Sequence, residues 1–399
     1  MRPQIGLAFA VPLVHLAASR DLWTGRSGDR VRLDLIPTSG RAGVRTLPSL
    51  RSRGVPPRHA RGPQSRGSER ARVWLFSSTR VVGRSAHWIA CIGSARRPLA
   101  HRMPHTEPMV RRQLVATSAG VVEIVHLPGD GPPVLFFPGG HCRASTDCGW
   151  NMYTALGHEV ISFSRPGYGG TRVGRLSAAE FTPIVREVCE ELGISSVAAS
   201  VGVSFGGLQA IHVAAGKRSP AQRLILHSCA PSSLSYPDSR PEVVLGPVLF
   251  SPALQGLVWN AVRASIRSDA GLRMILSQLS NLPVSEWWGR MSDTDKDEAR
   301  RLLRAMRSDC GFVNDLRQGR NREAAARRQA MSRVHCPTLV TASRHDGGVA
   351  FAHAEDFARV LPDSILVELD SPTHLFWIGP AKGQLLRIIA SFIERPTSV

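Results

Sequence analysis

The feature that most constrains the fold of this chain is a series of short, almost uninterrupted apolar segments that alternate with stretches of helical pattern. Strands that are apolar on both faces are typical of a parallel sheet covered by helices on its two sides, because neither face meets water. The alternation predicts an α/β fold with a doubly wound, mostly parallel sheet. The predicted strands are residues 134–137, 159–163, 197–203, 223–227, 338–341 and 365–369.

Local signals support this interpretation. Residues 113–116 and 121–126 are β-prone, and residues 118–120 between them read Ser-Ala-Gly, which predicts an antiparallel hairpin. Further along, Ser177 and Glu180 occupy the two positions of a capping box and precede apolar residues at helical spacing. The turn of the hairpin and the start of the helix are therefore each marked by local residues.

A long interval, residues 228–337, interrupts the alternation and is predicted to be mostly helical. An insertion of this length between two sheet strands is typical of a subdomain, here a candidate lid over the site. Its bulky residues Trp259, Trp287 and Trp288 are expected to pack in a core. The predicted helices are residues 247–268, 271–279, 294–306 and 321–331. The predicted units are a first core part at 110–233, a helical cap at 234–333 and a second core part at 334–399.

The N-terminal part, residues 1–109, differs from the rest in charge. Residues 1–110 hold 19 arginines, no lysine and five acidic residues, so most of the net charge of +19 lies there. Arg, Gly, Pro and Ser recur without a helical or strand period, which predicts a disordered extension. Two interpretations stay open: a functional basic extension, or translation that starts later, at Met103 or Met109. Specific nucleic-acid binding is not expected, because neither interleaved aromatic residues nor a known module accompanies the arginines.

The cysteines bear on the cellular compartment. Their odd number and the lack of a C-x-x-C pair favour reduced thiols over a disulfide framework, so we expect a cytoplasmic protein. Secretion is the alternative, since residues 5–19 weakly resemble a signal peptide. A membrane span is not expected, because no stretch of about 18 apolar residues occurs. The cysteines are Cys91, Cys142, Cys148, Cys189, Cys229, Cys310 and Cys336.

A candidate nucleophile lies between a predicted strand and a predicted helix. Ser204, with Gly202 and Gly206 on either side, makes a G-x-S-x-G match. The pattern alone is weak, but its position at a strand-to-helix turn is specific. Such a turn exposes the serine oxygen, and the N-terminus of the following helix favours developing negative charge. Ser204 is therefore the predicted nucleophile.

Beyond the N-terminal extension, the chain resembles the α/β-hydrolase superfamily in the order of its motifs. Pro138, Gly139, Gly140 and His141 follow a predicted strand and resemble the family's H-G-G-P loop, with proline where histidine is usual. The resemblance implies that the backbone amides of Gly140 and Phe205 stabilise an oxyanion.

A second motif follows the next predicted strand. Arg165, Pro166, Gly167, Tyr168 and Gly169 resemble the family's R-x-G-x-G turn. The resemblance implies that this turn supports the edge of the sheet, and we do not expect Arg165 to be catalytic.

The predicted acid and base, Asp346 and His374, follow the last two predicted strands in the family order of Ser, Asp and His. A serine hydroxyl is a weak nucleophile at neutral pH, so an imidazole must accept its proton and a carboxylate must hold the imidazole in the correct tautomer. Asp356, which we place on a helix, and Asp370, close before His374, are alternative acids. The position at a strand end favours Asp346.

Three other histidines, His141, His345 and His353, are expected to be hydrogen-bonded structural residues. His141 borders the oxyanion loop and is also a candidate for substrate contact. The histidines and carboxylates lack the spacing of metal ligands, and no nucleotide-binding fingerprint follows a strand. We therefore expect catalysis without a metal or other cofactor.

The combined pattern predicts a serine hydrolase that cleaves an ester in a small-molecule acyl substrate through an acyl-enzyme. Serine at this strand-to-helix turn, the nucleophile elbow, disfavours haloalkane dehalogenase and epoxide hydrolase chemistry, because the related enzymes carry aspartate there. Thioesterase, lactonase, peptidase and carbon-carbon hydrolase activities stay open, since substrate choice depends on the lid. A non-catalytic protein that binds a small ligand is the alternative of another class, and the presence of all three triad residues argues against it.

Overall fold

The computed structural model describes part of the chain, namely residues 73–75, 111–216, 219–237 and 240–395. The predicted N-terminal extension lies outside the described residues, except for 73–75. The same holds for Met103, Met109, Cys91 and the signal-like segment 5–19.

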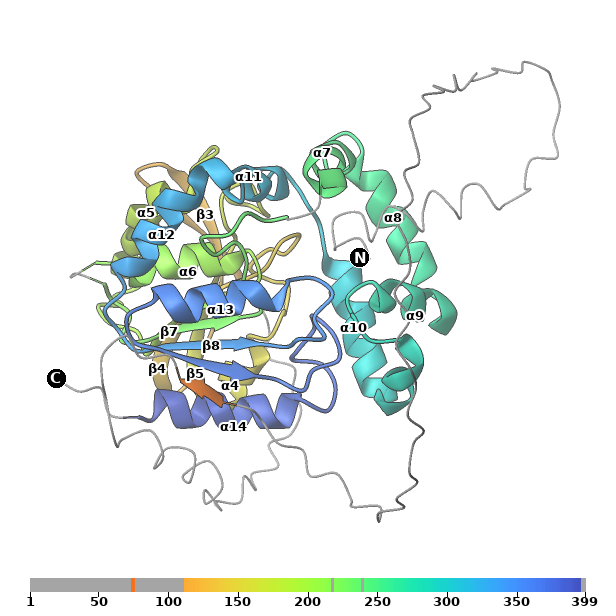
Figure 1. Ribbon diagram of the computed structural model, residues 1–399. Helices are drawn as coiled ribbons and strands as arrows, with labels where there is room; N and C mark the ends of the chain where they lie inside the picture. Colours follow the sequence, from red (N-terminus) through yellow and green to blue (C-terminus); the bar gives the residue numbers. More distant parts are fainter. Residues whose placement is uncertain (1–72, 76–110, 217–218, 238–239, 396–399) are drawn as a thin grey trace, which may run out of the picture.

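Within the described residues, nine strands form one sheet: β1 (Val73–Leu75), β2 (Arg111–Thr117), β3 (Gly120–Leu127), β4 (Gly131–Phe137), β5 (His158–Phe163), β6 (Ala199–Val203), β7 (Leu224–His227), β8 (Thr338–Ala342) and β9 (Ser364–Glu368). Their order across the sheet is β1-β9-β8-β7-β6-β4-β5-β3-β2 (Figure 1). Strands β4 to β9 pair in parallel. At the two ends, β1, β2 and β3 pair antiparallel. The mostly parallel α/β sheet and the β2–β3 hairpin are thus confirmed, whereas the edge strand β1 was not predicted.

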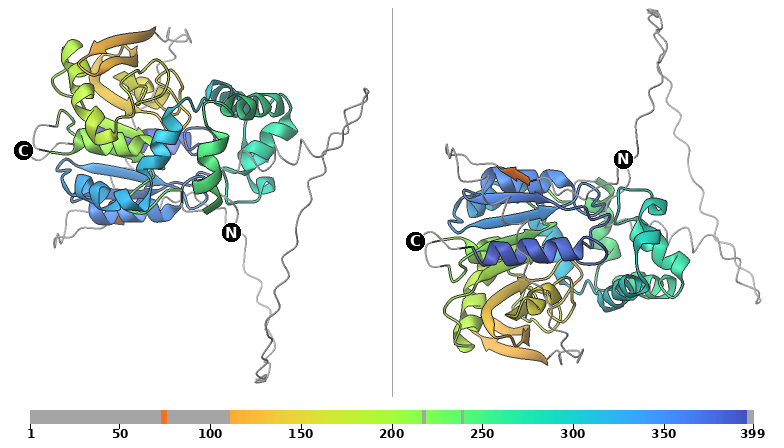
Figure 2. Two further views of the ribbon diagram at one scale, coloured as in Figure 1. Left: turned by 90° about the horizontal axis from the view of Figure 1, so that it is seen from above. Right: turned by 90° about the horizontal axis from the view of Figure 1, so that it is seen from below.

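Helices cover both faces of the sheet: α4 (Asn151–Ala155) and α14 (Lys382–Ile393) on one face, and α5 (Ala178–Glu191), α6 (Gly206–Ala214), α12 (Ala324–Ser332) and α13 (Phe351–Val360) on the other (Figures 1 and 2). Successive residues of a strand point to opposite faces. In β4, Val134 and Phe136 join the core on the α14 face, and Leu135 and Phe137 join the core on the α6 face. The doubly wound architecture follows from parallel strands that are mostly apolar and buried on both faces.

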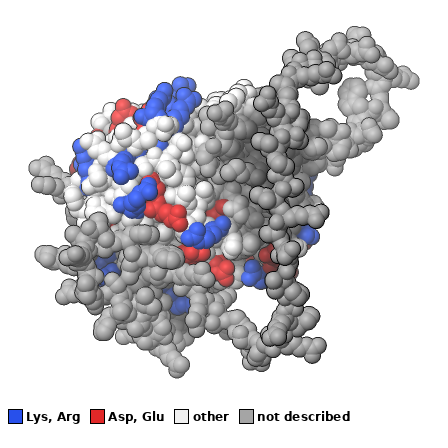
Figure 3. All heavy atoms as spheres, viewed as in Figure 1, with Lys and Arg blue, Asp and Glu red and all other residues white. Residues whose placement is uncertain are grey.

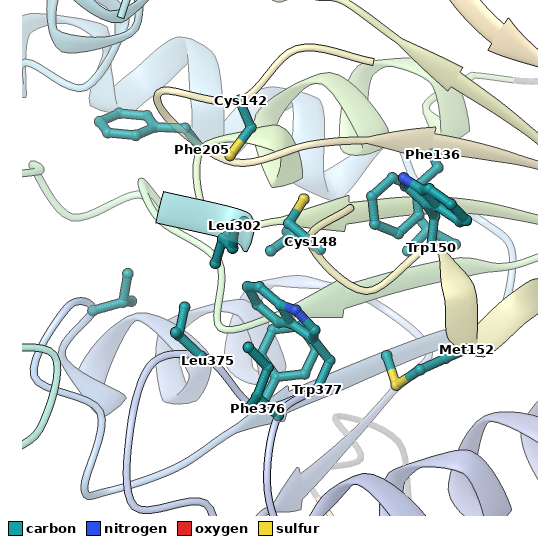
Figure 4. Packing of buried hydrophobic residues seen from close by; sticks show 14 of the residues in the cluster. Phe136, Cys142, Cys148, Trp150, Met152, Phe205, Leu302, Leu375, Phe376 and Trp377 are labelled. Atoms are coloured by element: carbon teal, nitrogen blue, oxygen red, sulfur yellow. The ribbon is translucent and has the colours of Figure 1, made fainter. Parts of the chain in front are cut away.

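Most helices of the insertion between β7 and β8 lie at one end of the sheet, whereas its last helix, α12, covers a face. The helices at the end are α7 (Arg240–Leu249), α8 (Gln255–Ser265), α9 (Asp269–Ser277), α10 (Asp293–Ala305) and α11 (Gly311–Gln318) (Figure 1). The hydrophobic core on the α14 face continues into these helices. Figure 4 shows Leu302 of α10 near Leu375, close to Phe376 and Trp377 of the same core. Trp259 and Trp287 are fully buried, as core packing requires.

The structure of the insertion differs from the predicted helices in two places. The predicted helix at 247–268 is two helices, because α7 ends at Leu249 and α8 starts at Gln255. Pro252 lies in the break and has no N–H to continue the helical hydrogen bonds. Helix α11 was not predicted at all, since its eight residues carry only a short apolar pattern.

Charged side chains of both signs are interspersed over the described part of the surface in Figure 3. This mixture contrasts with the arginine-rich sequence of residues 1–110.

Candidate active site

Ser204 occupies a sharp turn between β6 and α6. Its backbone has φ of 51°, a left-handed conformation that is rare for serine. The Ser204 N–H donates to the His227 carbonyl over 3.1 Å, and the Ser204 carbonyl accepts from the Gly207 N–H, also over 3.1 Å. A strained backbone fixed from both sides is typical of functional turns, and here it holds the serine at the carboxyl end of the sheet.

Three glycines make this turn possible. A Cβ atom on Gly202 would overlap the backbone of Gly207, and one on Gly206 would overlap the Phe137 carbonyl. A Cβ atom on Gly207 would lie 2.5 Å from the Cys229 sulfur. Strand, turn and helix therefore pack more closely than any side chain allows, which gives the G-x-S-x-G pattern a steric reason.

Asp346 and His374 are hydrogen-bonded to one another beside the turn. Asp346 Oδ2 lies 2.8 Å from His374 Nδ1, and both side chains are buried. The second oxygen, Oδ1, accepts from the Gly348 and Val349 amides over 2.6 and 2.9 Å. This arrangement fixes the carboxylate and leaves His374 Nε2 on the opposite side of the ring.

The insertion also holds these two residues. The His374 N–H donates to the Leu279 carbonyl over 2.9 Å. The Asn281 side-chain amide donates to the Asp346 carbonyl over 2.7 Å. The segment after α9 thus bridges the two loops that carry the predicted acid and base.

The alternative acids lie elsewhere. Asp356 is on α13, as expected, where its carboxylate accepts from Ser233 and pairs with Arg359. Asp370 is exposed. Of the other predicted structural histidines, His353 is buried with Nδ1 against Ser232, in agreement with that role.

The predicted oxyanion loop lies against the turn. A Cβ atom built on Gly139 would be 3.2 Å from Ser204 Cβ. One pocket contains Ser204, His374, Phe205, Gly140 and His141. The remaining residues that line it are Tyr236, Pro237, Gly246, Leu279, Leu302, Leu303, Met306, Phe312, Leu316 and Leu375. The structure thus brings five of the six predicted site residues into one pocket, with the sixth, Asp346, behind His374.

His141 has an unusual environment at this pocket. Its ring lies 3.7 Å from the Phe312 ring, centroid to centroid, and its Nδ1 lies 2.8 Å from Ser308 Oγ. Burial, with a contribution from the charge of Arg165, lowers the pKa of His141 to about 3, so the ring is neutral at pH 7. Its Nε2 is buried and has no hydrogen-bond partner among the described residues.

Arg165 is buried at the carboxyl end of β5 and forms an ion pair with Asp315 of α11. It also donates to the carbonyls of Pro138 and Gly139 in the oxyanion loop. The motif predicts Arg165 in a supporting turn, but no sequence pattern points to Asp315. No sequence signal pairs two residues so far apart when one of them lies on an unpredicted helix.

The described ranges contain no group of three or more His, Cys, Asp or Glu side chains that could hold a metal ion. In the same ranges, none of the helices has the length and apolar character needed to cross a bilayer.

Two known proteins are similar to this chain in sequence. An uncharacterized hydrolase of Bacillus subtilis is 28% identical over 290 residues, which cover 72% of this chain and 100% of that protein. An esterase of Mycobacterium tuberculosis is 31% identical over 124 residues, or 29% of this chain and 39% of that protein.

Solved structures share the fold. An alpha/beta hydrolase fold protein from Nakamurella multipartita matches with a TM-score of 0.54 and 24% identity, over 71% of this chain and 99% of that one. A thermophilic esterase from Thermogutta terrifontis matches with a TM-score of 0.50 and 19% identity, over 71% and 98%. Residues 132–380 match the family described as alpha/beta hydrolase fold, and the chain is a hydrolase-fold protein that belongs to this family.

Proposed function

We propose that the protein is a serine hydrolase that cleaves a carboxylic ester or a related acyl bond through an acyl-enzyme. The observation that carries the proposal is the position of Ser204. It lies in a strained turn at the start of α6 and lines one pocket with His374, whose Nδ1 is bound to Asp346.

The proposed mechanism assigns one role to each group. Asp346 holds the proton of His374 on Nδ1, so Nε2 is free to accept the proton of Ser204. Ser204 Oγ then attacks the acyl carbonyl, and the amides of Gly140 and Phe205 stabilise the oxyanion. His374 passes the proton to the leaving group, and water, activated by the same ring, hydrolyses the acyl-enzyme.

The lining of the pocket supports an uncharged acyl substrate. Leucine, methionine and phenylalanine side chains make up most of the wall, and none of the lining residues is Asp, Glu, Lys or Arg. His141 adds a neutral ring with an unused nitrogen, which we assign to contact with a substrate oxygen. A charged acyl group would lose its hydration there without gaining a partner.

The test is labelling with a fluorophosphonate probe, followed by peptide mapping, in parallel with a panel of nitrophenyl esters and thioesters of increasing acyl length. We expect labelling on Ser204 and turnover that the Ser204→Ala variant loses. Ser228→Ala is the matched control, because Ser228 is also a buried serine with positive φ at a strand end. Folded wild-type protein that neither labels nor turns over would favour the ligand-binding alternative.

A further inference from the structure

We propose that Arg165, Asp315 and Tyr168 form a positioning network that sets the direction of the Gly140 amide and ties it to helix α11. The inference rests on the proposed function, since it concerns an amide assigned to the oxyanion. None of the three side chains lines the pocket, so the network acts through the loop and not on the substrate.

Arg165 holds the peptide group that joins Gly139 to Gly140. Its Nη2 donates to the Gly139 carbonyl over 3.0 Å, and its Nε donates to the Pro138 carbonyl over 3.1 Å. In a planar trans peptide, the carbonyl of one residue and the N–H of the next point in opposite directions. Because the Gly139 oxygen is held toward Arg165, the Gly140 N–H must point away from it, on the side of the loop opposite the guanidinium.

Tyr168 holds the next peptide. The His141 N–H donates to the Tyr168 hydroxyl over 3.3 Å, and that hydroxyl donates to Asp315 Oδ2 over 2.6 Å. Burial, reinforced by the Asp315 charge, raises the pKa of Tyr168, so the hydroxyl stays protonated and can donate. The peptides on both sides of Gly140 are therefore fixed by one network.

Asp315 connects this network to the insertion. Its Oδ2 accepts from Arg165 Nη2 over 2.9 Å, and its Oδ1 contacts Nη1, a bidentate geometry with both side chains buried. A buried guanidinium without its carboxylate would be an uncompensated charge. Asp315 therefore determines whether Arg165 can stay in the place from which it orients the loop.

The start of helix α11 packs closely against the turn that carries Arg165 and Tyr168. A Cβ atom on Gly311 would overlap the Tyr168 ring. The Cys310 N–H donates to the Gly167 carbonyl over 3.1 Å, and the Gly169 N–H donates to Asp309 Oδ2 over 3.0 Å. Phe312 of the same helix lines the pocket. One helix thus supplies part of the pocket wall and fixes the amide opposite it.

The test compares Asp315→Asn and Tyr168→Phe with wild type in ester hydrolysis. For Asp315→Asn we expect kcat to fall by about 10- to 100-fold with KM changed by no more than about twofold, because a misdirected amide weakens binding of the transition state and not of the substrate. Tyr168→Phe removes one hydrogen bond from the network and should lower kcat by about 3- to 10-fold. Affinity for a trifluoromethyl ketone, whose adduct with Ser204 carries an oxyanion, should fall by the same factors.

Arg223→Lys is the matched control. Arg223 is as buried as Arg165 and also donates to two backbone carbonyls, those of Phe392 and Arg395. It directly precedes β7, so it lies at the amino ends of the parallel strands, away from the pocket at their carboxyl ends. We expect this variant to lower the unfolding midpoint and to keep the wild-type kcat and ketone affinity per folded molecule.

The outcomes separate the two proposals. Wild-type kcat and ketone affinity in folded Asp315→Asn and Tyr168→Phe would overturn the network while leaving the serine hydrolase in place. If the losses of kcat and ketone affinity are no larger than the unfolded fraction of each variant explains, the three residues have a purely structural role. That result would also overturn the positioning role. If Asp315→Asn does not fold, Tyr168→Phe, which keeps the ring and the ion pair, decides alone. Wild-type protein without turnover or labelling would instead contradict the proposed function.

Discussion

The two walls of the pocket differ in chemistry. The core wall comes from loops at the carboxyl ends of parallel strands and carries the polar side chains of Ser204 and His374, beside Gly140 and Phe205. The wall from the insertion carries mainly hydrocarbon, from Leu302 and Leu303 of α10 to Phe312 and Leu316 of α11. The strand ends therefore supply the groups that would act on the substrate, and the insertion supplies the surface that would select it.

Removal of the predicted nucleophile is the strongest way to test this division. Ser204→Ala should lower kcat by about 10⁴-fold or more, because no other group in the pocket can form the acyl-enzyme. Ester hydrolysis checks this, with circular dichroism as the control for folding. Residual turnover near the wild-type level would mean that the core wall does not carry the chemistry.

The hydrogen bond behind the base provides a second test. Asp346→Asn should lower kcat by about 10²- to 10⁴-fold, because the amide can favour the wrong tautomer of His374. Asp356→Asn is the control, since Asp356 binds Ser233 and Arg359 instead. Equal effects of the two substitutions on kcat would remove Asp346 from its assigned role.

The turn that holds Ser204 should be far less tolerant than the insertion. Gly206→Ala should lower the free energy of unfolding by about 3 kcal/mol, because the new methyl group overlaps the Phe137 carbonyl. Gly256→Ala on α8 meets no atom within 4 Å and should raise it by about 0.5–1 kcal/mol. Denaturant unfolding measures both. Similar values for the two variants would contradict the steric argument for the elbow glycines.

A smaller change in the insertion should alter selectivity and not chemistry. Met306→Ala shortens a side chain of the hydrocarbon wall and so enlarges the pocket, which should shift kcat/KM toward longer acyl chains by about 10-fold, with kcat on the best ester retained. Met291→Ala, at a half-buried methionine outside this pocket, is the control. An unchanged chain-length profile in Met306→Ala would show that the insertion does not select the substrate.

The mildest test concerns pH. Burial lowers the pKa of His227 in the core to about 3, and Nε2 and Nδ1 of its ring bind Tyr153 and Thr341. Between pH 6.5 and about 3 the unfolded chain therefore binds a proton that the native ring does not. This proton makes the free energy of unfolding fall as the pH is lowered, by about 1.4 kcal/mol per pH unit. Denaturant titrations should show a shallower slope in His227→Gln. The pKa of His141 in the pocket is also lowered to about 3. His141 should therefore contribute a slope of similar size that the His227→Gln substitution does not remove.

Most of the core could be predicted from local patterns. The apolar strands, the hairpin and the capping box at Ser177 depend on residues that are neighbours in the sequence. Ser204, Asp346 and His374 could be named because each follows a strand, and the ends of parallel strands meet at one edge of the sheet. The insertion was harder, since the helix break near Pro252 and the short helix α11 follow from packing and not from period.

The sequence by itself determined the sheet, the elbow and the candidate triad, because their signals are apolar runs and glycines within a few residues of the groups they place. Only the tertiary structure decided that Asp315 meets Arg165 and that Ser308 meets His141. These partners lie 150 and 167 positions apart. The sequence around a single charged or polar residue does not indicate its partner, because these residues become buried and paired only when the insertion folds back onto the strand ends.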